Sequence, residues 1–129
     1  MKLLIVLVVS VVGAVSGQCR SGWEYISASH KCIGLAQSCP SGTSAARIGS
    51  WQETQAAISL MKSPLMANIG NNANSNNRYS NWASGQPSPD GSQVFILPNG
   101  EWYTYIAAYA HIRDRPYICE QTLNQRPLV

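Results

Sequence analysis

Long apolar runs and charged residues are both scarce in this sequence. After residue 17 no apolar run reaches the length of a membrane span, so no span is expected beyond that point. Asp, Glu, Lys and Arg make up 12% of the 129 residues, and the formal net charge is +3. This small basic excess is spread along the chain, which argues against nucleic acid or an anionic membrane as a dedicated partner.

The first 17 residues have the pattern of a secretory signal peptide. Lys2 supplies a positive start, an apolar run follows, and Val15-Ser16-Gly17 is a small-residue cleavage site. An uncut signal anchor is the alternative interpretation. We expect residues 1–17 to be a signal peptide and residues 18–129 to be a secreted, extracellular domain. That length suits one domain and is too short for two cores.

All four cysteines follow this segment, and an even count in a small exported domain predicts two disulfides. The 12, 6 and 79 intervening residues fit no zinc-binding pattern. Three pairings are possible. A bridge from Cys19 to Cys32 is economical because it would close a short hairpin around the strand-like segment WEYIS.

Nothing in the sequence supports a catalytic site. Four bridged cysteines would leave no thiol, and no motif places a nucleophile beside His111, Arg113, Asp114 and Arg115. We interpret these four as solvated loop residues. The protein is therefore not expected to be an enzyme.

Aromatic residues gather between Tyr79 and Glu120, where five of the six tyrosines lie with Trp82 and Trp102. Such density requires a core or a binding face. The apolar segments there are short and are broken by Gly, Pro and Asn-Gly turn signals. This pattern predicts several strands joined by tight turns.

Three segments of this stretch, NWASGQP, VFILPNGEWYTY and PYICE, resemble the C-terminal half of a C-type lectin-like domain. The segment GWEYI resembles the opening of the long form of that domain. The resemblance implies an α+β C-type lectin-like fold with small antiparallel sheets, one clear helix and a long irregular loop region. It also implies a secreted lectin that binds carbohydrate, or alternatively an extracellular protein or surface, and it leaves the oligomeric state open.

The resemblance also implies the disulfide framework, with Cys19 paired to Cys32 and Cys39 to Cys119. Only IGLAQS separates Cys32 from Cys39, whereas the family places a strand and a whole helix between the corresponding cysteines. Six residues are too few for both, so the family's first helix is expected to be missing or much reduced.

A helix is predicted from about Trp51 to Lys62. Ser50 can cap it, and Glu53 can return a bond to the Ser50 amide. Pro64 is expected to end the helix. Its apolar side is expected to carry Trp51, Ile58, Met61 and Leu65.

Calcium ligands of the family are mostly replaced in this sequence. The family's Q/E-P-D/N segment corresponds to Gln86-Pro87-Ser88, and its Asn-Asp pair after Trp corresponds to Tyr103-Thr104. Asp90 is the one nearby carboxylate, which is too few for a hard cation. The cysteines that normally link this loop correspond to Gln93 and Ala107. We therefore expect no cofactor and no calcium.

Exposed tyrosines are the remaining candidates for ligand contact. If Trp102 points inward, strand alternation places Tyr103 and Tyr105 on the opposite face. Two interpretations stay open: these rings meet a ligand, or Tyr105 and Tyr109 fill the space of the missing helix. The candidate ligand-binding residues are Gln86, Ser88, Asp90, Tyr103, Thr104 and Tyr105.

Overall fold

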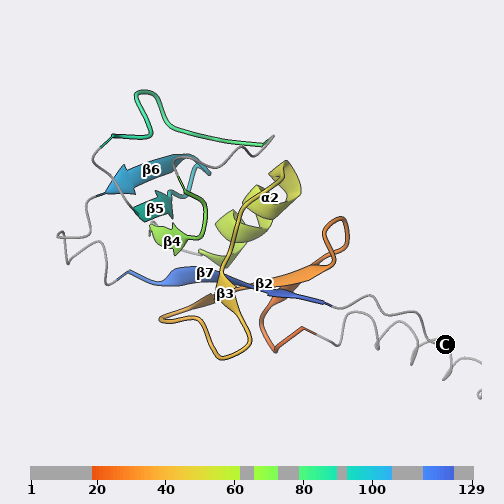
Figure 1. Cartoon of the computed structure of the whole chain (residues 1–129). Helices are drawn as coiled ribbons and strands as arrows, with labels where there is room; N and C mark the ends of the chain where they lie inside the picture. Colours follow the sequence, from red (N-terminus) through yellow and green to blue (C-terminus); the bar gives the residue numbers. More distant parts are fainter. Residues whose placement is uncertain (1–18, 62–65, 73–78, 90–92, 106–114, 124–129) are drawn as a thin grey trace, which may run out of the picture.

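A computed structural model describes residues 19–61, 66–72, 79–89, 93–105 and 115–123. These residues form seven strands and one helix in an α+β arrangement (Figure 1). The elements are β1 (Glu24–Ile26), β2 (Lys31–Ala36), β3 (Ser44–Ala45), α2 (Trp51–Leu60), β4 (Ala67–Ile69), β5 (Gln93–Ile96), β6 (Trp102–Tyr105) and β7 (Tyr117–Thr122). The predicted signal peptide, Pro64, Leu65, Asp90, Ala107, Tyr109 and the 111–114 segment lie outside the described residues.

The last strand, β7, holds the sheet together. It pairs antiparallel with the whole of β2 along one edge, and on its other edge it meets β3 and, in parallel, β4. The strand order is β1-β2-β7-β4-β5-β6, with β3 beside β7. The first and last described strands lie in one sheet, since β1 and β7 are both neighbours of β2. The resemblance implied small antiparallel sheets, whereas the strands form one mixed sheet, because β4 runs parallel to β7.

The N-terminal hairpin follows the sequence expectation. β1 and β2 pair with Ile26 opposite Lys31, and His30 in the turn between them has a φ of 53°. The indole ring of Trp23 lies against Gly34 of β2, so closely that a side chain at position 34 would overlap the ring. Gly34 thus allows an aromatic ring to rest directly on the backbone of the strand.

The helix is confirmed, and its end is close to the predicted one. Ser50 Oγ accepts a hydrogen bond from the Glu53 amide at 3.1 Å, as expected of an N-cap residue. The return bond was predicted wrongly. Glu53 Oε1 accepts from the Gly49 amide at 2.9 Å and not from Ser50, because the same oxygen also meets Lys31 Nζ.

The predicted apolar side of the helix is wrong for Trp51, which is 57% exposed. Met61 is buried and Ile58 is half-buried, but the helix turns mainly small or polar side chains toward the sheet. The buried positions within the helix are Glu53, Thr54, Ala56 and Ala57. Small side chains let the helix approach the sheet closely, while Trp51 sits in the first turn and points away from the core.

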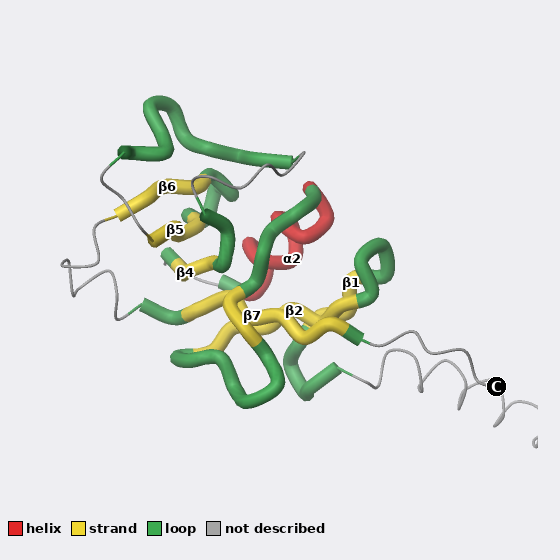
Figure 2. The backbone as a smooth tube through the Cα atoms, in the orientation of Figure 1, coloured by secondary structure: helices red, strands yellow, loops and turns green. Residues whose placement is uncertain are grey.

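Between Cys32 and Cys39 the chain forms only the strand β2, and α2 is the only helix within residues 19–61 (Figure 2). The expected loss of the family's first helix is confirmed for this fully described range. Both predicted disulfides, Cys19–Cys32 and Cys39–Cys119, are present. The second joins the turn before β3 to the middle of β7, across 80 positions of sequence.

Candidate functional site

Residues 79–89 run along the outer edge of β6, the last strand of the sheet (Figure 2). The Trp102 amide donates to the Asn81 carbonyl at 2.9 Å, and the Ala83 amide donates to the Trp102 carbonyl at 3.0 Å. An edge strand otherwise presents unpaired amides and carbonyls to other chains. The segment therefore closes the sheet edge at Trp102.

Two positions further along β6, at Thr104, the side chain of Gln86 pairs with the strand edge in place of a backbone group. Gln86 Oε1 accepts hydrogen bonds from the Thr104 amide at 3.0 Å and from Thr104 Oγ1 at 2.9 Å. Thr104 Oγ1 in turn accepts from the Ser88 amide at 2.8 Å. These three sequence-predicted site residues form one connected network, which we call the Gln86–Thr104–Ser88 network. The Gln86–Pro87 peptide bond between two of them is cis.

The hydrogen-bond donors fix how the Gln86 amide is oriented. The Thr104 backbone N–H can only donate, so the Gln86 atom that faces it must be the oxygen. Thr104 Oγ1 already accepts from Ser88, and its single proton is free to go to the same oxygen. Among the described residues, nothing accepts from Gln86 Nε2 or pairs with Ser88 Oγ.

Aromatic rings anchor the start of this segment. Trp102 is 1% exposed and makes edge contacts with Tyr79 and Trp82, at centroid distances of 5.9 and 5.3 Å. Tyr79 Oη lies 2.7 Å from Thr54 Oγ1, which ties the segment to α2. Edge-to-face geometry of this kind is favourable for aromatic pairs. The loop therefore starts from a fixed point in the core.

The opposite face of β6 carries Tyr103 and Tyr105, as strand alternation predicted. Phe95 stacks on Tyr103 at 5.7 Å and contacts Tyr105 at 5.6 Å. Tyr105 is only 5% exposed, and its hydroxyl donates to Asn68 Oδ1 at 2.6 Å. Tyr105 is thus a core residue and cannot offer an exposed ring, whereas Tyr103 is half-buried. The structure therefore excludes Tyr105 as an exposed contact residue, and a ligand contact at Tyr103 stays a prediction.

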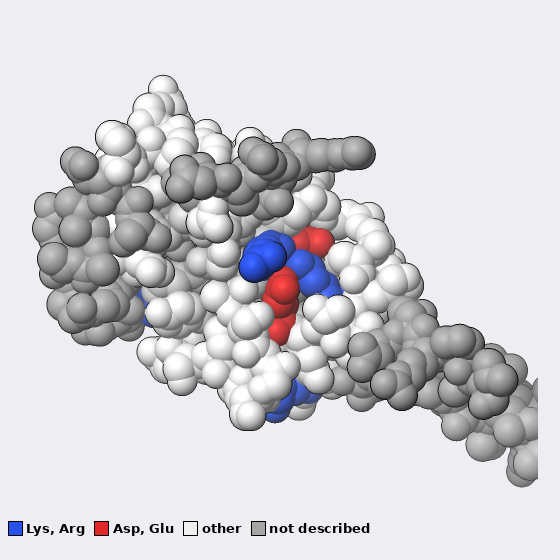
Figure 3. All heavy atoms as spheres, viewed as in Figure 1, with Lys and Arg blue, Asp and Glu red and all other residues white. Residues whose placement is uncertain are grey.

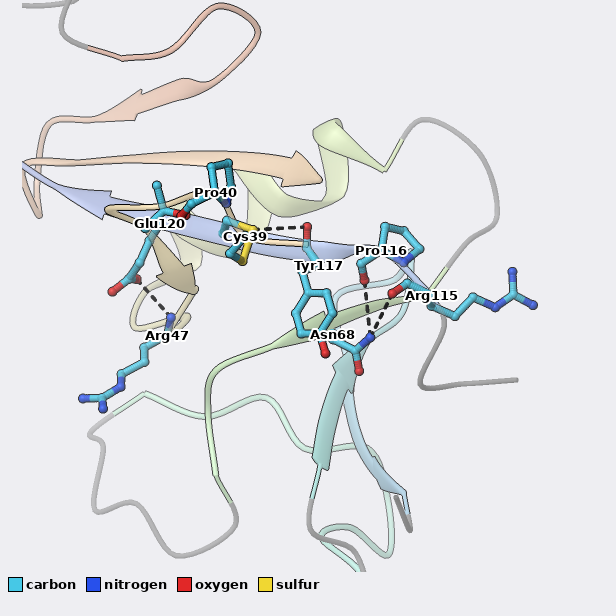
Figure 4. The surroundings of a disulfide bond; sticks show 10 residues. Cys39, Pro40, Arg47, Asn68, Arg115, Pro116, Tyr117 and Glu120 are labelled. Atoms are coloured by element: carbon cyan, nitrogen blue, oxygen red, sulfur yellow. Dashed lines mark hydrogen bonds between the residues drawn. A yellow bond between two sulfur atoms is a disulfide. The ribbon is translucent and has the colours of Figure 1, made fainter. Parts of the chain in front are cut away.

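Asn68 links three strands beneath this aromatic face. Its amide Nδ2 donates to the carbonyl of Arg115 at 3.1 Å, just before β7, and lies 3.5 Å from that of Pro116 (Figure 4). Its Oδ1 accepts the Tyr105 hydroxyl from β6. The side chain is 1% exposed, so every one of these bonds is shielded from water. The sequence showed only an Asn where the family has an apolar residue, and its partners could not be inferred.

A buried ionic cluster on the other side of the molecule was missed by sequence reasoning. Lys31 Nζ lies 2.9 Å from Glu53 Oε1 and 2.7 Å from Glu120 Oε1, and it donates to the Arg47 carbonyl at 2.8 Å. Figure 3 shows red and blue side chains beside one another near the middle of one face, with further blue side chains at its lower edge and at the left. One signal existed in the sequence: Lys31 directly precedes the apolar run of β2. Its partners Glu53 and Glu120 are 22 and 89 positions away, and the residues around them in the sequence do not indicate an ion pair.

The geometry offers no ready cation site in the described residues. No group of three His, Cys, Asp or Glu side chains lies close enough together there to hold a metal ion. Gln93, at one of the family's cysteine positions, is an exposed residue of β5. In the described ranges no helix is long and apolar enough to cross a bilayer.

Sequence comparison identifies no relative of this chain. No protein-family model matches it, and no curated protein matches it.

Structure comparison does find similar folds. The human scavenger receptor C-type lectin carbohydrate-recognition domain matches with a TM-score of 0.63 and 18% identity, over 81% of this chain and 99% of that chain. Human lithostathine matches with a TM-score of 0.61 and 14% identity, over 85% and 94%. The cow CD23 carbohydrate-recognition domain, solved in the presence of a GlcNAc2Man3 oligosaccharide, matches at 0.59 and 16%, over 82% and 97%.

These matches span nearly the whole length of each neighbour. The chain has the C-type lectin-like fold.

Proposed function

We propose that this protein is a secreted C-type lectin-like protein that binds carbohydrate and does not need calcium to do so. The proposal rests first on the fold, because two of the three neighbours named above are carbohydrate-recognition domains. Both predicted disulfides are formed, which suits an oxidising, extracellular compartment. The same neighbours support a binding role.

The observation that carries the calcium independence is the use made of Gln86 Oε1. A hard cation needs six to eight oxygen ligands, several of them carboxylates. Here the amide oxygen that would face the cation accepts two hydrogen bonds from Thr104 instead. The Gln86–Thr104–Ser88 network therefore supports a loop that is held by the protein alone.

A glycan array tests this function, with each sample run once in millimolar calcium and once in chelator. We expect the same set of glycans to be bound in both conditions. Binding that disappears in chelator would show a calcium-dependent lectin. An array with no glycan bound in either condition would refute carbohydrate binding.

A second candidate is a calcium-independent module that binds an extracellular protein and no sugar. One observation favours it: Trp51 is 57% exposed at the start of α2, far in sequence from the loop segment. Exposed Trp is enriched at protein interfaces. Capture of a protein partner that is lost in Trp51→Ala, together with an empty glycan array, would select this candidate.

A further inference from the structure

The Gln86–Thr104–Ser88 network decides the hydrogen-bonding character of the surface that it leaves exposed. The Gln86 side-chain oxygen already accepts from the Thr104 amide, and the Ser88 amide already donates to the Thr104 hydroxyl. What remains is the Gln86 Nε2 group, with two N–H donors, and the Ser88 hydroxyl. Both residues are partly exposed to solvent.

We propose that this site binds the carboxylate or sulfate group of an acidic saccharide through Gln86 Nε2 and Ser88 Oγ. The inference rests on the proposed carbohydrate binding and adds the chemical class of the ligand. Hydrogen bonds from neutral donors to an ionised acceptor are roughly twice as strong as neutral pairs. A surface that presents donors thus favours an anionic acceptor over a neutral sugar hydroxyl.

Few charged residues lie near this site in the sequence. In the described residues 79–89 and 93–105 the only charged side chain is Glu101. Its carboxylate accepts from Asn99 Nδ2 at 3.1 Å, and Glu101 precedes Thr104 by three positions, roughly 10 Å at the usual rise per residue. Asp90, two positions after Ser88, lies outside the described residues. The proposed secreted domain, residues 18–129, has eight Lys and Arg against six Asp and Glu, a small positive excess that attracts an anion.

One substitution separates the donor surface from the network that holds it. Gln86→Glu keeps an oxygen for the two Thr104 donors and replaces the Nε2 donor by a second acceptor of the same shape. The hydrogen bonds with Thr104 are retained, while the Nε2 donor of the side chain is replaced by a carboxylate oxygen that repels an anion. Ser88→Ala removes the second donor and leaves the Ser88 amide in the network.

The matched control is Gln52→Glu. It makes the same change in net charge at an exposed position of α2, outside the loop segment. Any loss of binding caused by overall charge alone would occur in this variant as well.

The experiment measures the binding of three tetrasaccharides to the full chain in chelator at fixed ionic strength. A hyaluronan fragment supplies carboxylates alone, a heparin fragment supplies sulfates as well as carboxylates, and maltotetraose is neutral. We expect at least one acidic fragment to bind about tenfold more tightly than maltotetraose, the factor that a single charge-assisted hydrogen bond provides. Binding of the heparin fragment alone would indicate sulfate recognition, and binding of the hyaluronan fragment would indicate carboxylate recognition.

For the acidic fragment, we expect Gln86→Glu to weaken binding at least tenfold and Ser88→Ala to weaken it several-fold, with Gln52→Glu unchanged. Equal or tighter binding of maltotetraose by the wild type would overturn the inference, as would an equal loss in Gln86→Glu and Gln52→Glu. If Gln86→Glu does not fold, the Ser88→Ala result decides in its place. Failure of the wild type to bind any of the three would overturn the inference, and the glycan array then decides whether the proposed carbohydrate binding fails as well.

Discussion

Two regions of this molecule are held together by different forces. The base region, made of β1, β2, β3, β7 and α2, has both disulfides, the long β2–β7 ladder and the Lys31 ionic cluster. The loop region, made of residues 79–89 with β5 and β6, has neither a disulfide nor an ion pair among its described residues. Neutral hydrogen bonds and aromatic contacts hold it instead.

The difference shows how one fold can divide stability from recognition. Bonds in the base region link residues up to 89 positions apart, and Lys31, which makes several of them, is buried. Those of the Gln86–Thr104–Ser88 network join residues 16 and 18 positions apart and are part-buried. Changes in the base region should therefore cost more folding free energy than changes in the loop region. Five predictions, from the largest expected effect to the smallest, can break or sharpen this comparison.

Removal of the Cys39–Cys119 bridge should have the largest effect. The double variant Cys39→Ala/Cys119→Ala is expected to lose on the order of 4 kcal/mol of unfolding free energy, because a loop closed across 80 positions is released in the unfolded chain. Urea denaturation of the variant and of the wild type measures the difference. A loss below about 1 kcal/mol would show that the bridge contributes little to the base region.

Loss of the ammonium group at Lys31 should be next. Lys31→Met leaves two carboxylates facing each other without a cation, and a cost of about 3 kcal/mol is expected because one partner of a buried ionic group is gone. Urea denaturation again supplies the number. The triple variant with Glu53→Gln and Glu120→Gln removes the uncompensated charges and should regain most of the loss. No recovery in the triple variant would mean that packing, and not charge, explains the effect.

Tyr105→Phe probes the boundary between the regions. It leaves Asn68 Oδ1 without its buried donor, and about 1–2 kcal/mol of stability should be lost. Tyr25→Phe is the matched control, since the Tyr25 hydroxyl makes its 3.3 Å contact with His30 at an exposed position. Thermal melts of both variants should show a shift for Tyr105→Phe only.

Thr104→Val tests the loop region. The variant keeps the shape and removes the hydroxyl that joins Gln86 to Ser88, so a loss of about 1 kcal/mol is expected. Hydrogen exchange at the Ser88 amide should accelerate, while exchange at the β2–β7 ladder stays at the wild-type rate. Thr104→Ser should restore slow exchange. Unchanged exchange at Ser88 in Thr104→Val would contradict the network.

Calcium should have no effect on stability. Because Gln86 Oε1 is already bonded to Thr104, thermal melts in millimolar calcium and in chelator are expected to superimpose. An upward shift with calcium that is abolished by Asp90→Ala would show that the loop holds a cation after all.

Local patterns gave a large part of this fold from the sequence. Ser50 marked the helix start because a cap acts within three residues, and the strand-like segment WEYIS indicated the N-terminal hairpin. Spacing between Cys32 and Cys39 excluded a strand and a helix together. The lectin-like resemblance gave the disulfide pairing, and it placed Gln86, Ser88 and Thr104 in one site, where the structure joins them.

Contacts between residues that are distant in the sequence determined the part of the structure that the sequence did not predict. Nothing near Lys31 in the sequence marks Glu53 and Glu120 as its partners, because only the packing of α2 against the sheet and the ladder of β7 bring them together. Trp51 was predicted to be buried from its hydrophobicity, yet the helix approaches through Ala56 and Ala57.

Composition and local spacing thus determined which elements form, since caps, turns and strand alternation act within a few residues. Tertiary structure decided which surfaces those elements expose. Tyr105 is a core residue whose ring contacts Phe95 and whose hydroxyl donates to Asn68, which lies 37 positions away in the sequence. Gln86 became a donor surface only because Thr104 takes its oxygen, a choice that depends on where two distant segments meet.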